Sequence, residues 1–73
     1  MSNKEDDIKR RYVVGCVRAF LEGKKNLNWV MAFVRGHHLT KSELGDILTK
    51  ARPNADNARY DELLSACREQ GLL

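Results

Sequence analysis

The sequence has 73 residues, with 13 lysines and arginines, 10 aspartates and glutamates, and a formal net charge of +3. This length allows one domain with a limited core, which we assign to residues 1–73. The hydrophobic share of 42% and the charged share of 32% exclude a disordered chain, and the basic excess is smaller than in most dedicated nucleic-acid-binding proteins.

The first predicted element is a long helix over about Lys4–Glu22. Ser2 and Glu5 form a capping-box pattern at its start. Gly15 lies inside the helix, where we expect it to let another helix approach closely. Gly23 suits the left-handed residue that often follows a helix end. Apolar residues recur at spacings of three and four, which predicts one buried face made of Ile8, Tyr12, Val13, Cys16, Val17, Phe20 and Leu21.

A shorter helix follows, with Asn26 or Asn28 as its N-cap and Gly36 at its end. Trp29 falls outside the apolar stripe of this helix, where it either packs beside the first helix or is partly exposed. The His37–His38 pair forms the link to the next helix. The stripe itself consists of Leu27, Val30, Met31 and Val34, widened by Phe33.

The clearest helix start in the chain lies at Thr40. Glu43 follows three residues later, so the Thr40 hydroxyl is expected to accept a hydrogen bond from the Glu43 backbone N–H while the carboxylate accepts from the Thr40 N–H. This pattern predicts a helix over Lys41–Ala51, which ends there because Pro53 disfavours helical backbone in the residue before it. We expect residues 28–73 to organise the fold around this helix. Its predicted buried face consists of Leu44, Ile47, Leu48 and Ala51.

The last helix follows a Pro-Asn turn and has Asn54 or Asp56 as its predicted cap. Its apolar face consists of Tyr60, Leu63, Leu64 and Cys67. Gly71 predicts a left-handed C-terminal cap, with Leu72 folded back onto the helix. The sequence therefore predicts an all-α, compact four-helix domain whose last three helices resemble a helix-turn-helix without a wing.

The segment around Thr40 also supports a DNA-binding hypothesis. The pattern Leu-Thr-x-x-Glu-Leu-Gly-x-x-Leu over residues 39–48 resembles the first helix of many helix-turn-helix motifs, with Gly45 where two helices would approach closely. The last helix would then be the recognition helix. Its acidic residues oppose this because they place negative charge where phosphates would lie. The candidate DNA contacts, of which those on the last helix should point outward, are Lys50, Arg52, Asn54, Asn57 and Arg59.

Little in the sequence points to catalysis or to a bound metal. It contains no glycine-rich phosphate loop, no nucleophile elbow and no His-Glu-x-x-His motif. Cys16, Cys67 and the His37–His38 pair lack the close paired spacing of structural zinc sites. We therefore predict that the protein is not an enzyme, that it uses no cofactor or metal, and that both cysteines are buried and reduced. With no apolar run that approaches a membrane span and no signal peptide, we expect a cytoplasmic protein.

The basic start of the first helix favours a protein partner. Lys9, Arg10, Arg11 and Tyr12 combine positive charge with arginine and tyrosine, residue types that often anchor interfaces. A bare DNA-binding motif would not need this additional helix. A solvated helix face is the alternative reading of the same residues. The candidate partner-binding residues are Lys9, Arg10, Arg11, Tyr12, Arg35, His37 and His38.

In the residues Met1–Phe20 and Trp29–Leu44 the chain resembles small bacteriophage transcription regulators that bind host RNA polymerase. Within this group the resemblance is to the type found in a Xanthomonas phage. The resemblance is one of length, basic start and helical pattern over the whole chain, without a signature motif. It implies binding to the N-terminal part of the polymerase β′ subunit and to the β flap. It also implies inhibition of promoter initiation, by interference with the σ factor, and antitermination. We expect such a regulator to be a monomer.

Overall fold

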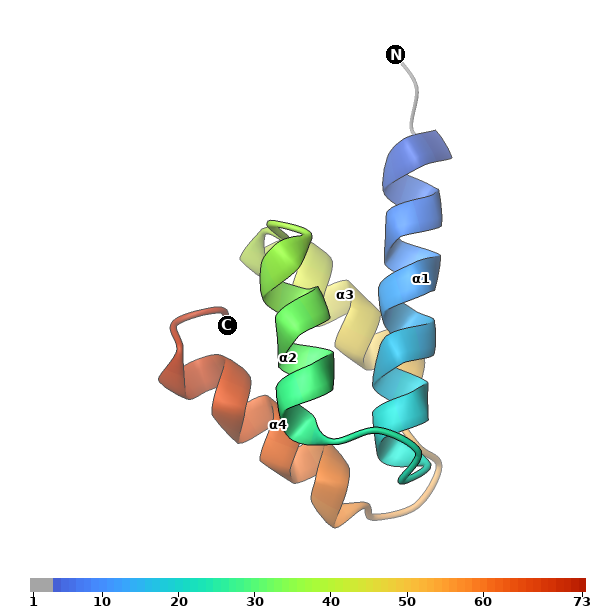
Figure 1. The fold of residues 1–73 in the computed structure, drawn as a ribbon, viewed down its shortest axis with the longest axis vertical. Coiled ribbons are helices and arrows are strands. Elements are labelled where there is room, and N and C mark those ends of the chain that lie inside the picture. Colours follow the sequence, from blue (N-terminus) through green and yellow to red (C-terminus); the bar gives the residue numbers. More distant parts are fainter. Residues whose placement is uncertain (1–3) are drawn as a thin grey trace.

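Four helices joined by short links make up the part of the chain that the structure describes, residues 4–73, with side chains from residue 8 onward (Figure 1). No strand occurs within this range, which confirms the predicted all-α fold with four helices. None of these helices has the length and apolar character needed to cross a membrane. The predicted capping box at Ser2 and Glu5 lies outside the described residues. This computed structural model places α1 at Lys4–Leu21, α2 at Leu27–Gly36, α3 at Lys41–Ala51 and α4 at Ala58–Glu69.

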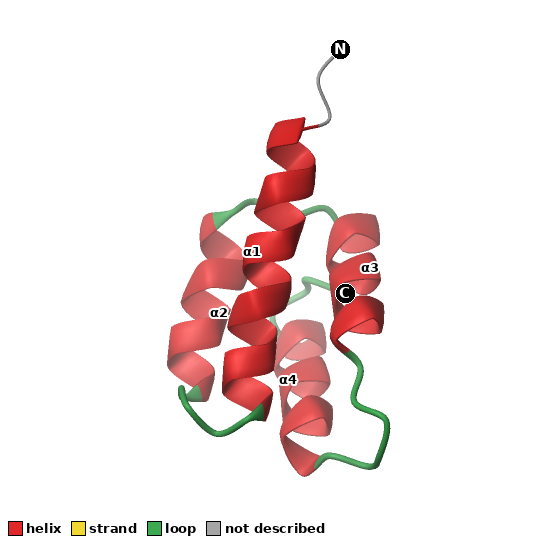
Figure 2. Ribbon diagram, turned by 90° about the vertical axis from the view of Figure 1, so that its right-hand side faces the viewer, coloured by secondary structure: helices red, strands yellow, loops and turns green. Residues whose placement is uncertain are grey.

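Helix α1 is the element against which the other three helices pack. Figure 2 shows α2 and α3 on either side of it, and each of the later helices contacts α1 more extensively than it contacts the others. Our expectation that residues 28–73 organise the fold is therefore wrong. The reason is length: at a rise of about 1.5 Å per residue, the 18-residue α1 offers a longer surface than helices of 10 to 12 residues.

One hydrophobic core takes residues from all four helices. The predicted inward face of α3 is confirmed at each position, and the predicted stripe of α2 is buried at Val30, Met31 and Val34. On α4 Leu63 and Cys67 are buried, while Tyr60 and Leu64 are only partly buried. Burying each large side chain contributes roughly 1.5–3 kcal/mol relative to leaving it exposed. The core residues are Val13, Val14, Cys16, Val17, Phe20, Val30, Met31, Val34, Leu44, Ile47, Leu48, Ala51, Leu63 and Cys67.

The N-terminal turns of α1 depart from the predicted apolar face. Ile8 is 65% exposed and Tyr12 is 53% exposed, so neither belongs to the core. Val14, which the apolar pattern omitted, is buried instead. The first turns of α1 extend past the ends of α2 and α3 (Figures 1 and 2), so this end of the helix has less of the protein to pack against than its C-terminal end.

Side-chain caps begin the last three helices. The Asn26 carboxamide oxygen accepts from the Trp29 N–H at 2.8 Å, which selects Asn26 over Asn28. At α3 the predicted capping box is confirmed in both directions. At α4 the cap is Asn57, so the prediction of Asn54 or Asp56 is wrong: the backbone stays non-helical through residue 57, and Asn57 accepts from the backbone N–H groups of two following residues.

Glycines in the left-handed region end α1 and α4. Gly23 has φ +82° and Gly71 has φ +72°, conformations that side chains rarely adopt. The N–H of Leu72 donates to the carbonyl of Cys67 at 2.8 Å, which closes a Schellman motif and confirms the predicted cap. Leu72 packs partly buried against the core.

Gly15 and Gly45 do not allow close helix approach, contrary to our expectation. A Cβ atom built at either position would meet no heavy atom within 4 Å beyond its own helix backbone and chain neighbours. Both glycines lie where no neighbouring helix packs closely, so each costs helix stability without allowing a close contact.

Cys16 and Cys67 are buried and not bonded to each other, as predicted. Burial raises the pKa of both thiols, and that of Cys67 to about 11. The thiols therefore stay protonated at neutral pH and behave as small apolar groups.

Candidate protein-binding surface

The N-terminal half of α1 carries two exposed apolar side chains, Ile8 and Tyr12, which together we call the apolar ridge. They lie four residues apart and therefore share one side of the helix, one turn from each other. Among the residues whose side chains are described, these two are the large apolar side chains with high exposure. Exposed apolar groups concentrated on one projecting element are typical of interaction surfaces.

Aromatic rings on α2, together with His37 directly after it, extend the apolar ridge. The Tyr12 ring meets Phe33 edge-on, with a centroid distance of 5.5 Å, and meets His37 in the same manner at 5.8 Å. Trp29 packs against Phe33 at 4.6 Å, and the Lys25 ammonium lies 5.2 Å from the Trp29 ring. Trp29 is thus half-buried beside Phe33 on its own helix. Of the two positions predicted for it, partial exposure is the one that the structure shows.

Two of the predicted partner-binding cations are engaged with α3. Lys9 Nζ lies 3.7 Å from a Glu43 carboxylate oxygen, and Arg10 lies 4.0 Å from Glu43 and 3.9 Å from Asp46. The backbone N–H of Thr40, followed by the charges of Lys9 and Arg10, lowers the pKa of Glu43 despite some desolvation. These contacts tie the N-terminal half of α1 to the start of α3.

The other predicted partner-binding residues divide into two groups. The His37 ring packs against the Tyr12 ring, as described above, and Arg11 is exposed on the same turn of α1 as Tyr12. Arg35 and His38 are exposed at the end of α2, and no contact links either to Tyr12 within the described residues. His38 has φ +51°, which places a non-glycine residue in the left-handed region at the start of the link to α3.

Four of the five candidate DNA contacts line one open hollow of about 470 Å³ between α1, α3 and the link that follows α3. Arg52 and Asn54 are exposed there, while the Asn57 amide oxygen is occupied by the cap of α4. The four residues are Lys50, Arg52, Asn54 and Asn57.

Arg59 contradicts the expectation that it points outward. Its Nε donates to the Phe20 carbonyl at 2.6 Å, its Nη2 donates to the Lys25 carbonyl at 2.8 Å, and its guanidinium lies 4.3 Å from the centre of the Phe20 ring. The Phe20 carbonyl lies in the last turn of α1, where the helix carries a partial negative charge that favours a cation, and the Lys25 carbonyl lies in the link that follows. Arg59 therefore fastens α4 to α1.

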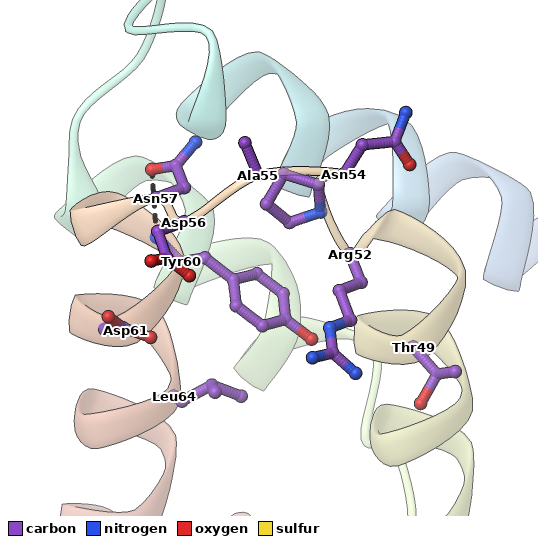
Figure 3. Close-up of a pocket in the computed structure, with 10 residues that line it drawn as sticks. Thr49, Arg52, Asn54, Ala55, Asp56, Asn57, Tyr60, Asp61 and Leu64 are labelled. Carbon is purple, nitrogen blue, oxygen red and sulfur yellow. Dashed lines mark hydrogen bonds between the residues drawn. The ribbon is translucent and has the colours of Figure 1, made fainter.

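A second, larger hollow of about 910 Å³ lies beside the α3–α4 link (Figure 3). The Tyr60 ring reaches across it, and its hydroxyl donates to the Leu48 carbonyl at 2.8 Å. Arg52 lines this hollow together with Asp56 and Asp61, so its charge is mixed. The acidic residues that argued against DNA binding are therefore placed beside the candidate DNA contacts.

The sequence pattern missed Ile8, Phe33 and Glu43 as parts of this surface. Relative helix lengths carried a usable signal for Ile8, because helices of 10 and 11 residues cannot cover an 18-residue helix along its whole length. No comparable local signal marks Glu43, whose cation partners lie far away in the sequence.

Comparison with known proteins adds no assignment. No protein-family model matches the chain, and no curated protein or solved structure is significantly similar to it. Within the described residues, no group of three or more histidine, cysteine, aspartate or glutamate side chains is placed to hold a metal ion. The surface around the apolar ridge is therefore interpreted from its own geometry.

Proposed function

We propose that this protein is a small transcription regulator that binds host RNA polymerase through the apolar ridge of α1. The observation that carries the proposal is the exposure of Ile8 and Tyr12, 65% and 53%, in the N-terminal half of a helix whose first turns project from the bundle. Removing apolar area from water contributes roughly 25 cal/mol per Å². Because Tyr12 adjoins Phe33, a partner that covers the ridge would bury a connected apolar surface.

The projecting helix end fits a groove on the partner. An amphipathic helix that inserts its apolar side into a groove is a common mode of protein recognition. Lys9 and Arg10, which we first expected to contact the partner, hold α1 against α3 at 3.7–4.0 Å. They fix the direction of the helix before binding, which lowers the entropy lost on association.

The resemblance to polymerase-binding phage regulators supports RNA polymerase as the partner. On this proposal the ridge contacts the N-terminal part of the β′ subunit, and the protein also reaches the β flap. Arg11, exposed beside the ridge, would meet acidic groups on the polymerase and raise the association rate. Occupation of these surfaces would inhibit promoter initiation by interfering with the σ factor, and would suppress termination.

The alternative function is DNA binding by α4 and the link before it. It is supported by the hollow that Lys50, Arg52 and Asn54 share. It is weakened by Asn57 and Arg59, because the Asn57 amide oxygen and the Arg59 guanidinium are used within the fold. The few phosphate contacts left to this surface would give weak binding, because affinity grows with the number of phosphates that are neutralised.

The test replaces Ile8 by Glu and measures binding to purified core polymerase by fluorescence anisotropy, with run-off transcription as a second readout. We expect at least a tenfold loss of affinity, because a charged side chain would replace the apolar one that the complex with polymerase buries. Ser65→Glu is the matched control: it makes the same charge change at an exposed position of α4. Tyr12→Ala provides a second variant of the ridge.

Arg11→Glu tests the charged contact separately. Arg10 is unsuitable for charge reversal because a glutamate there would face Glu43 and Asp46. Unchanged polymerase binding by Ile8→Glu and Tyr12→Ala would remove the ridge from the interface. Tight sequence-specific binding of the free protein to duplex DNA, with no affinity for polymerase, would favour the alternative function.

A further inference from the structure

An open groove of about 510 Å³ runs along the junction of α1 and α3, and we call it the α1–α3 groove. Its lining includes four cationic side chains and, among the described residues, no carboxylate. It borders α3, whereas the Tyr12 ring of the apolar ridge packs against side chains of α2. The lining residues are Arg10, Arg11, Val14, Gly15, Arg18 and Lys50.

The positive charge of this groove is only partly compensated within the protein, in which Arg11 also has an interaction of its own. The Arg10 guanidinium has carboxylates at 3.9 and 4.0 Å, and among the described residues its buried Nε finds no hydrogen-bond acceptor. Arg18 donates to the Lys50 backbone carbonyl at 3.5 Å, a contact that orients the side chain without neutralising it. Lys50 has one carboxylate partner, Asp46, at 3.3 Å. Anionic groups would therefore gain contacts in the groove.

The groove has a regular shape along α1. Arg11, Gly15 and Arg18 follow the i, i+4, i+7 pattern and therefore share one side of the helix. At a rise of about 1.5 Å per residue, the two arginines are roughly 10 Å apart along the axis. A Cβ at Gly15 would meet nothing within 4 Å, so the glycine leaves a notch midway between them. Val14, 8% exposed, adds an apolar floor.

We propose that the α1–α3 groove binds an acidic amphipathic helix of a partner protein. Two carboxylates seven residues apart on such a helix would pair with Arg11 and Arg18, because both helices have the same rise per residue. An apolar side chain between them would occupy the notch at Gly15, over Val14. Arginine pairs with carboxylate through two parallel hydrogen bonds, which gives the site specificity as well as affinity.

The lining favours a protein helix over a nucleic acid. Proteins that bind single strands stack the bases on aromatic side chains, and no aromatic residue lines this groove within the described part of the chain. The notch and its apolar floor suit an aliphatic side chain, whereas phosphates would contact only the cations. This site does not include Ile8 or Tyr12 and does not depend on polymerase being the partner, although Arg11 borders both surfaces. Gly15 and Arg18 belong to the groove alone, so their variants test it independently of the ridge.

The probe is a fluorescein-labelled helical peptide with glutamates seven positions apart and a leucine four positions after the first glutamate. The control peptide has the same composition but glutamates five positions apart, which puts them on different sides of its helix. Binding to the 73-residue chain is measured by fluorescence anisotropy. We expect the first peptide to bind at least tenfold more tightly than the control, with an affinity that falls as salt is added.

Gly15→Leu tests the groove without threatening the fold. Leucine is a better helix former than glycine, and the space at Gly15 is open, so the variant should fold while its side chain fills the notch. Gly45→Leu is the matched control, since it makes the same change at an open helical glycine on α3 that does not line the groove. Gly15→Leu and Arg18→Gln should each weaken peptide binding at least tenfold, and Gly45→Leu should leave it unchanged.

Three results would overturn the proposal. The first is the absence of binding by the patterned peptide, or equal binding of the two peptides. The second is a Gly15→Leu variant that binds the patterned peptide as the unmodified protein does. The third is preferential binding of a fluorescein-labelled DNA duplex that is lost in Gly15→Leu, which would assign the groove to phosphates.

Discussion

The two ends of α1 differ in how the rest of the protein covers them. At the C-terminal end Phe20 is 1% exposed, and Arg59 closes over its ring and binds the Phe20 carbonyl. At the N-terminal end Ile8 is 65% exposed, and long ion pairs of 3.7–4.0 Å to α3 hold the helix. The same apolar periodicity runs through both ends. The periodicity therefore marks the face available for burial, while the lengths of the neighbouring helices decide how much of it is buried.

The largest expected effect comes from truncating one apolar side chain at each end of α1. Phe20→Ala should destabilise the protein by about 3–5 kcal/mol, because it leaves a cavity in the core, and it also removes the ring that Arg59 covers. Ile8→Ala should change the free energy of unfolding by less than about 0.5 kcal/mol. Urea denaturation followed by circular dichroism measures both. A similar loss in the two variants would mean that the ends are equally packed.

Removing the Arg59 guanidinium sharpens the comparison at the buried end. Arg59→Met keeps the apolar contact with Phe20 but loses the two hydrogen bonds to carbonyl groups, which should cost about 1.5–3 kcal/mol. Arg59→Lys keeps the positive charge without the planar guanidinium, so it should lose less stability than Arg59→Met. Thermal denaturation of both variants checks this order. Stability equal to that of the unmodified protein in Arg59→Met would show that Arg59 does not fasten α4 to α1.

The cap of α3 supports the open end, because Glu43 both completes the capping box and pairs with Lys9. Thr40→Ala removes the hydroxyl that accepts from the Glu43 N–H at 3.1 Å and should cost about 1 kcal/mol. In a domain of this size that corresponds to a fall in Tm of about 4–8 °C. An unchanged Tm would contradict the assigned role of the hydroxyl.

The smallest expected effect is a pH dependence at Glu43. Its pKa lies below the ordinary value, chiefly because the Thr40 backbone N–H donates to the carboxylate, so the charged form stabilises the folded state. This contribution is present above the ordinary glutamate pKa of about 4.3 and is lost as the pH falls through the lowered folded-state value. Glu43→Gln keeps a cap acceptor without the charge. Its stability should lie below that of the unmodified protein at neutral pH and converge with it in acid, while the exposed Glu62→Gln serves as control.

The parts of the fold that depend on neighbours in the sequence could be predicted. The capping box at Thr40 joins residues three positions apart, and the α4 end at Gly71 depends on backbone conformation within one turn. The cap of α4 could not be chosen because Asn54, Asp56 and Asn57 have similar capping propensities. Tertiary contacts near the start of α4, such as the Tyr60 hydroxyl donating to Leu48, help to fix where that helix begins.

The candidate surface was predicted less well than the fold. Tyr12 and His37 were named and lie together, but the sequence alone could not show that Lys9 and Arg10 pair with α3 or that Arg59 turns inward. These contacts join residues more than 30 positions apart, and apolar periodicity carries no information about them. The likeness of the last three helices to a helix-turn-helix stays a prediction.

The burial of both native thiols makes the chain suitable for site-specific labelling. With its pKa raised to about 11, Cys67 holds a negligible thiolate fraction at neutral pH, and Cys16 is buried as well. A single cysteine introduced at an exposed position such as Ser65 would therefore react first with a maleimide dye, and the native cysteines need not be replaced. A fluorophore or spin label placed this way can report how far the chain lies from any molecule that it binds.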